Sequence, residues 1–181
     1  MQGLLQYHAA RISIGVQNPT EVKKAIDTLM AQGVYLDDFY DAIGWTHPRI
    51  DEVLRGLRAA LDYFGIGIPR AADAVRIIVE YHVRRIASGS IDAVEGLQEL
   101  VDAVDCSRSL SSQAARLMRE CQDGIKDLQA LYWCIEDVEC YAISQSFDAG
   151  DSTGAQPDVA TQWNALRNDI RKAAQRWLEE R

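Results

Sequence analysis

Apolar residues recur at intervals of three and four along most of the chain, with polar and charged residues between them. This spacing is the period of an amphipathic helix, which buries one side and leaves the other to solvent. The most regular stripe lies near the C-terminus and consists of Val159, Trp163, Leu166, Ile170, Ala173 and Trp177. We expect this stripe to dock on the protein's own core or on a second copy of the chain.

Helix-starting and helix-ending residues separate the periodic segments. Asn18, Asp92 and Asp158 stand where a side chain accepts hydrogen bonds from the first backbone N–H groups of a helix. Gly33 and Gly89 stand where helices are expected to end. The pattern predicts an all-α fold, a single domain over residues 1–181. It would contain seven to nine short antiparallel helices, arranged as a bundle or as a short irregular helical solenoid.

The expected helices cover residues 4–14, 19–32, 36–43, 48–64, 69–87, 92–104, 110–122, 125–145 and 158–177. A short strand is the alternative for residues 12–16, where apolar residues alternate. Residues 146–157 are rich in Gly, Ser and Asp and predict a mobile loop. Gly96 lies inside one expected helix, which suggests that another helix approaches closely there.

Composition and charge exclude several classes of protein. The chain has 181 residues, of which 48% are hydrophobic, so it is long and apolar enough to form a core. It has no membrane-spanning stretch and no basic start typical of a signal peptide, so we expect a soluble cytoplasmic protein. We expect its four cysteines to be reduced and mostly buried. The formal net charge of −8 disfavours nucleic acid and anionic membranes as partners.

No motif for nucleotide, zinc or hydrolase chemistry is present in the sequence, so no cofactor is expected. His82 falls on an apolar face, where a histidine is usually a hydrogen-bonded core residue. Residues 36–64 have the lengths of a helix-turn-helix, but Asp51 and Glu52 would face phosphates, which argues against DNA binding.

Acidic residues form two clusters that are candidates for chemistry. Glu95, Glu99 and Asp102 are spaced by four and three residues and share one side of a helix. A second cluster lies at residues 136–139. If the two helices face each other, the two clusters together would form the site of a magnesium-dependent phosphohydrolase. A solvent-exposed helix face explains the first cluster more simply, because it lies opposite the apolar stripe.

An aromatic and acidic segment is the second candidate site. We expect this segment to contact another protein through Trp133, Glu136, Asp137, Glu139 and Tyr141. Exposed aromatic side chains among carboxylates are typical of a surface that binds a basic partner. The alternative is that Tyr132 and Trp133 lie at the edge of the core.

The segment from Ala87 to Gly96, ASGSIDAVEG, together with the order of the flanking helices, resembles a loose group of small bacterial all-helical proteins. The resemblance implies a bacterial, cytoplasmic, helical protein and no established activity. We therefore expect a non-enzymatic, immunity- or regulator-like interaction module with an acidic helical surface. Its partner would be another protein, basic in character, or a second copy in a homodimer. The alternative is the magnesium-dependent phosphohydrolase.

Overall fold

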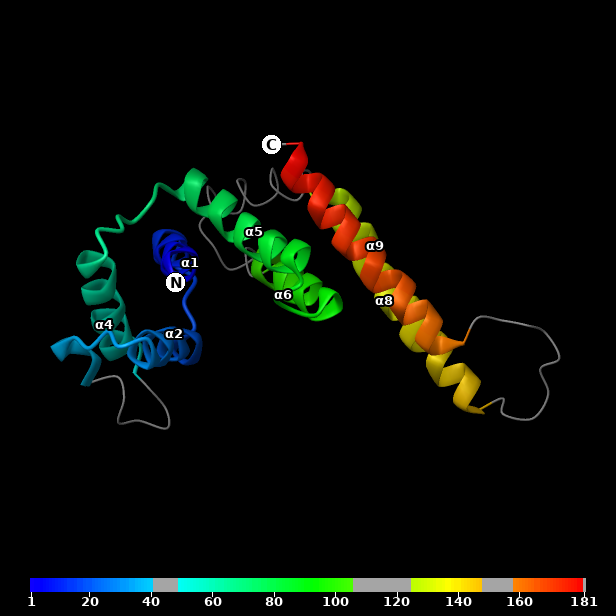
Figure 1. Cartoon of the computed structure of the whole chain (residues 1–181), viewed down its shortest axis with the longest axis horizontal. Helices are drawn as coiled ribbons and strands as arrows, with labels where there is room; N and C mark the ends of the chain where they lie inside the picture. Colours follow the sequence, from blue (N-terminus) through cyan, green and yellow to red (C-terminus); the bar gives the residue numbers. More distant parts are fainter. Residues whose placement is uncertain (41–48, 106–124, 148–157, 181) are drawn as a thin grey trace. The chain divides into compact units, whose positions relative to one another are not determined.

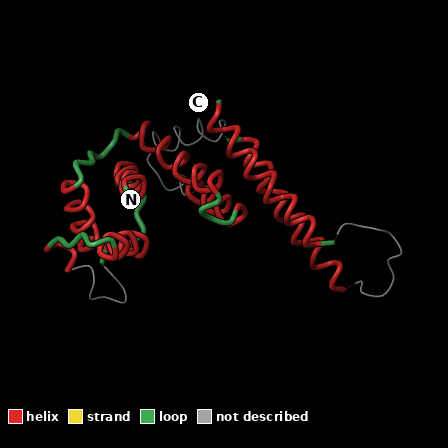
Figure 2. The backbone as a smooth tube through the Cα atoms, viewed as in Figure 1, coloured by secondary structure: helices red, strands yellow, loops and turns green. Residues whose placement is uncertain are grey.

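The computed structural model describes residues 1–40, 49–105, 125–147 and 158–180. Every regular element in these ranges is a helix, which confirms the all-α fold (Figures 1 and 2). The elements are α1 (Gln2–Ile14), α2 (Pro19–Ala31), the 3₁₀ turn η1 (Asp37–Phe39), α4 (Ile50–Tyr63), α5 (Ala71–Ser88), α6 (Ala93–Asp105), α8 (Lys126–Phe147) and α9 (Val159–Glu179). None of the described helices is long and apolar enough to cross a bilayer.

The described residues fall into two compact units, which divide within α5 between Tyr81 and His82. In the first unit, α1, α2 and α4 pack on one another, and η1 packs on α4. Their shared core consists of Leu5, Ala9, Val22, Ile26, Leu29, Phe39, Val53, Leu57, Ala60 and Leu61. The short strand considered for residues 12–16 is wrong, because α1 continues to Ile14 and ends at Gly15, whose φ of 76° is left-handed.

The second unit is formed by α6, α8, α9 and the C-terminal turns of α5. Leu166, Ile170 and Ala173 from the regular stripe of α9 are buried, and α9 packs on α6 and α8. The stripe was expected to pack on the protein's own core or on a second copy of the chain, and the structure shows it packed on the protein's own core. Helices α8 and α9 lie side by side as an antiparallel pair (Figure 1). Helix α8 extends through Phe147, and the rest of the predicted mobile loop, residues 148–157, lies outside the described residues.

The three predicted helix starts are confirmed by hydrogen bonds. Asn18 accepts from the N–H of Thr20 at 2.9 Å, and Asp92 and Asp158 accept in the same way at the starts of α6 and α9. The close approach predicted at Gly96 is also confirmed. A β-carbon there would lie 2.7 Å from Cγ1 of Ile86 on α5, so glycine allows α5 and α6 to touch.

Candidate interaction surface

Helix α8 separates its apolar and polar residues onto two sides. Leu128 and Ile135 are buried in the core of the second unit, as is Ile125 directly before the helix. Because a helix turns by 100° per residue, the residues three, four and seven positions from one another share a side. Ala130, Trp133, Asp137 and Cys140 therefore lie together on the side away from this core, and all four are exposed.

The most prominent residue of this side is Trp133, whose side chain is 63% exposed. Its ring meets the ring of Tyr132 edge to face, with centroids 5.9 Å apart. Tyr132 is half-buried, so it lies at the edge of the core as one alternative predicted. Trp133 does not, because most of its surface is in solvent. Tryptophan is enriched at protein interfaces, since its ring carries one of the largest apolar surfaces of any side chain and its N–H is polar.

Carboxylates flank Trp133 on the same side of α8. Glu136 and Asp137 follow it by three and four residues, and both are exposed. We call Trp133, Glu136, Asp137 and Cys140 the Trp133 face. Glu139 is exposed as well, but it lies six residues from Trp133 and points to another side of the helix. Tyr141 is in α8, and its side chain lies outside the described ones.

A groove runs between α8 and α9 beside the Trp133 face. Its volume is about 680 Å³. It is lined by Asp127, Ala130, Leu131, Cys134, Asp169, Lys172, Gln175, Arg176 and Glu179. We call it the α8–α9 groove. Trp133 does not line the groove itself, but Ala130 lies one turn before it and Cys134 directly follows it, so it neighbours the groove along α8.

The lining of the groove has an ordered distribution of charge. The α8 wall supplies three small or apolar side chains, Ala130, Leu131 and Cys134, and one acidic residue, Asp127, at its start. On the α9 wall, the bases Lys172 and Arg176 stand between two acidic residues at the ends of the wall. The sequence interpretation missed these two bases. Their spacing of four residues on one side of a helix was a usable signal, but which side of α9 would border α8 depends on tertiary packing.

The four cysteines are only partly as expected. Cys134 and Cys140 are free thiols. Cys134 is half-buried and Cys140 is exposed, so the expectation of core positions is wrong for Cys140. Cys106 and Cys121 lie outside the described residues.

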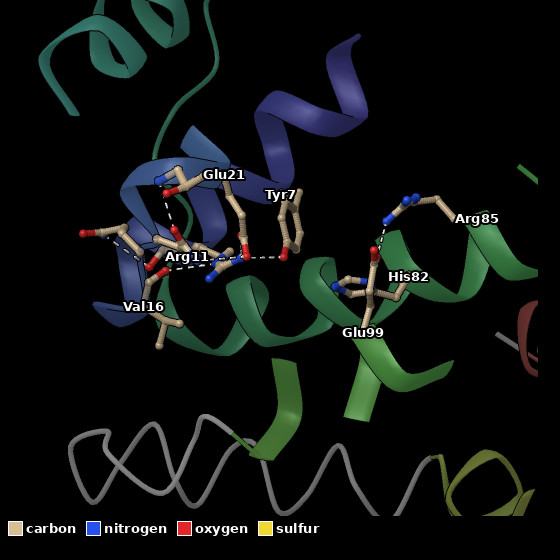
Figure 3. A network of polar contacts seen from close by, with 10 residues as sticks. Tyr7, Arg11, Val16, Glu21, His82, Arg85 and Glu99 are labelled. Carbon is tan, nitrogen blue, oxygen red and sulfur yellow. Dashed lines mark hydrogen bonds and ion pairs between the residues drawn. The ribbon is translucent and has the colours of Figure 1, made fainter. Parts of the chain in front are cut away.

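The acidic stripe of α6 is divided by the structure. Glu95 and Asp102 are exposed, whereas Glu99 accepts a hydrogen bond from Nη1 of Arg85 at 2.5 Å (Figure 3). Nδ1 of the buried His82 lies 3.5 Å from the same oxygen of Glu99. The interaction with His82, followed by the charge and hydrogen bond of Arg85, outweighs burial and lowers the pKa of Glu99.

These contacts bear on the magnesium hypothesis. Within the described ranges, no three His, Cys, Asp or Glu side chains come together closely enough to hold one metal ion. Glu99 is already bonded to a cation, so a metal ion would have to displace Arg85. No ligand set for magnesium is therefore assembled in the part of the chain that the structure describes. The turn of the helix-turn-helix alternative falls within residues 41–48, outside that part.

A second polar network lies in the first unit and was not foreseen. The guanidinium of Arg11 donates to the hydroxyl of Tyr7 at 2.7 Å, to the carbonyl of Val16 at 3.1 Å and to the carboxylate of Glu21 (Figure 3). His8, on the same helix, is only 3% exposed. Burial, together with the charge of Arg11, lowers the pKa of His8 to about 4, so this histidine is neutral at pH 7. Both residues stabilise the fold of this unit and offer no open site.

Comparison with known proteins adds no assignment. No protein family, no curated protein and no solved structure matches this chain.

Proposed function

We propose that this protein is a non-enzymatic interaction module of the cytoplasm, immunity- or regulator-like, that presents the Trp133 face of α8 to another protein. The observation that carries the proposal is the exposure of Trp133 beside Glu136 and Asp137 on one side of a helix. Tryptophan is among the residues that contribute most to binding energy at protein interfaces, because its large ring is desolvated on contact.

The carboxylates define the chemistry of the partner. A partner surface for this face needs an apolar patch to cover the indole ring and positive charges to meet Glu136 and Asp137. A lysine or arginine of the partner would also interact favourably with the electron-rich face of the indole. The chain's net charge of −8 would speed the approach of a partner with a positive net charge at low ionic strength.

The proposal is tested by capture from the native cells with tagged wild-type protein and two single variants. Trp133→Ala removes the exposed ring of the Trp133 face. Tyr63→Ala is the matched control, because Tyr63 is 65% exposed and belongs to α4 in the other unit. The bound proteins are identified by mass spectrometry after a wash at moderate salt.

A stoichiometric partner that is lost with Trp133→Ala and retained with Tyr63→Ala supports the proposal. Binding that Trp133→Ala and a second variant, Glu136→Lys with Asp137→Lys, both leave unchanged would overturn it. Circular dichroism of each variant establishes that its helices are intact, so that a loss of binding is assigned to the surface.

A further inference from the structure

The α8–α9 groove has the chemistry that the Trp133 face requires of its partner. It offers a floor of Ala130, Leu131 and Cys134 for an apolar ring, and it carries the bases Lys172 and Arg176 along one wall. The Trp133 face offers the converse, an exposed ring flanked by the acids Glu136 and Asp137. The two surfaces therefore complement each other at the middle of the groove, where an exposed ring with two acids can meet a recess with two bases.

We infer that the partner of the Trp133 face is a second copy of this chain, whose α8–α9 groove receives Trp133 while its own Trp133 enters the groove of the first. This inference rests on the proposed function and names the partner of the same site. The volume of about 680 Å³ is larger than an indole ring, so the groove has room for Trp133 and for parts of the flanking acidic side chains.

The geometry favours a closed pair of copies. Trp133 and the groove adjoin on one helix pair, because Ala130 and Cys134 line the groove and immediately neighbour Trp133 along α8. When a projecting residue and its recess lie side by side, a twofold axis between two copies satisfies both at once. Each ring is then covered, and the association stops at two copies.

The charges determine how the ends of the interface are arranged. Asp169 and Glu179 lie at the two ends of the α9 wall, with the bases between them. Glu136 and Asp137 meet favourable charge only when they lie beside the middle of that wall. A shift of the second copy along the groove would place them against Asp169 or Glu179, where like charges repel. The α9 wall therefore selects one register.

The test measures the mass of the full-length protein by sedimentation velocity and light scattering at concentrations up to about 100 µM and about 0.15 M salt. The wild type is expected to form a dimer. Trp133→Ala is expected to weaken the dimer by at least about 30-fold, the size typical of an interface tryptophan. Arg49→Glu, at an exposed arginine at the start of α4, is the control charge reversal and leaves the mass unchanged.

A mixing experiment tests the pairing of the charges directly. One variant carries Glu136→Lys with Asp137→Lys, and the other carries Lys172→Glu with Arg176→Glu. Each variant alone is expected to be monomeric, because its face then meets side chains of its own sign at positions 172 and 176. An equal mixture of the two is expected to form a heterodimer, since in that pair each face meets side chains of opposite sign at these two positions. All changes are at surface positions, and circular dichroism verifies that both variants are helical.

The outcomes separate this inference from the proposed function. A wild type that stays monomeric, or a dimer that persists in Trp133→Ala and in both charge-reversed variants, overturns the second copy as partner. If capture from cells then yields a different protein that depends on Trp133, the proposed function stands with another partner. If Trp133 affects neither measurement, both ideas fail. A particle that grows beyond two copies contradicts the closed pair.

Discussion

Arg167 on α9 donates from Nε to Oδ2 of Asp92 at 2.9 Å, and Asp92 is the residue that caps α6. The same carboxylate accepts from the backbone N–H groups of Val94 at 3.0 Å and Glu95 at 3.4 Å. One side chain therefore begins α6 and ties α9 to that beginning. Because α9 forms a wall of the α8–α9 groove, this contact helps to hold the candidate interaction surface in place.

Asp92→Ala is expected to lower the free energy of unfolding by about 1–2 kcal/mol, since it removes a helix cap and an exposed ion pair together. Asp92→Asn keeps an oxygen that accepts from Val94 and loses only the charge. Its cost should be below about 1 kcal/mol. Urea unfolding at pH 7 measures both. Equal losses in the two variants would show that the cap contributes nothing and that the ion pair with Arg167 is the whole effect.

Gly96→Ala is expected to destabilise the second unit by about 1–3 kcal/mol, although alanine is the better helix former. The added β-carbon would lie 2.7 Å from Cγ1 of Ile86 and 2.8 Å from Cγ2 of Ile91, so α5 and α6 would have to separate. Thermal unfolding measures the change.

Gly3→Ala is the matched control for Gly96→Ala. Gly3 also lies in a helix, α1, and a β-carbon there meets nothing within 4 Å. Its melting temperature should stay near that of the wild type. If Gly96→Ala were as stable as Gly3→Ala, the close approach of α5 and α6 would not contribute to the stability of the protein.

Much of the fold was predictable from the sequence because its signals are local. The spacing of Leu166 and Ile170 predicted the buried side of α9, and the caps at Asn18 and Asp92 predicted where helices begin. Each of these signals depends on residues within two turns of one another, where helix geometry determines which side chains are neighbours. The close approach at Gly96 was also expected, since glycine inside a helix is costly unless something needs the space.

Only the α8 part of the candidate surface was predictable from the sequence. The exposure of Trp133 and its flanking acids follows from the period of α8 alone. The groove beside it joins Ala130 and Cys134 to Lys172 and Arg176, more than 30 residues later in the sequence. Which sides of α8 and α9 border each other depends on how both helices rotate to bury their apolar residues on α6. That rotation is a property of the packed core and has no local signal.

Arg11→Ala is expected to lower the free energy of unfolding by about 2–3 kcal/mol, because Tyr7, Val16 and Glu21 would each lose a partner. The Arg11 side chain is only 13% exposed, so water would replace those hydrogen bonds poorly. Lys23→Ala is the control, since Lys23 forms an exposed ion pair with Asp27 and should cost less than about 0.5 kcal/mol. Urea unfolding compares the two, and an equally small loss for Arg11→Ala would contradict the structural role of this network.

His8 is expected to make the stability of the first unit fall as the solution is acidified. Its pKa is about 4 in the folded protein and 6.5 in an unfolded chain, mainly because burial disfavours the charged ring. Between these values the unfolded state binds a proton that the folded state does not. The contribution of His8 is therefore complete above pH 6.5 and is lost as the pH falls toward 4. The lost stability approaches about 3 kcal/mol.

The substitution that isolates this effect is His8→Gln, because glutamine is polar and does not titrate. The variant is expected to be less stable than the wild type at pH 7.5, since the packing of the ring against Tyr7 is lost. The difference in the free energy of unfolding between the two proteins should shrink as the pH is lowered to about 4.5, because only the wild type has a buried histidine that must stay neutral in the folded state. Urea unfolding at a series of pH values measures this difference. Carboxylates titrate in both proteins and cancel in this difference. A difference that stays constant with pH would mean that the pKa of His8 is the same in the folded and unfolded states, and would contradict the effect of burial.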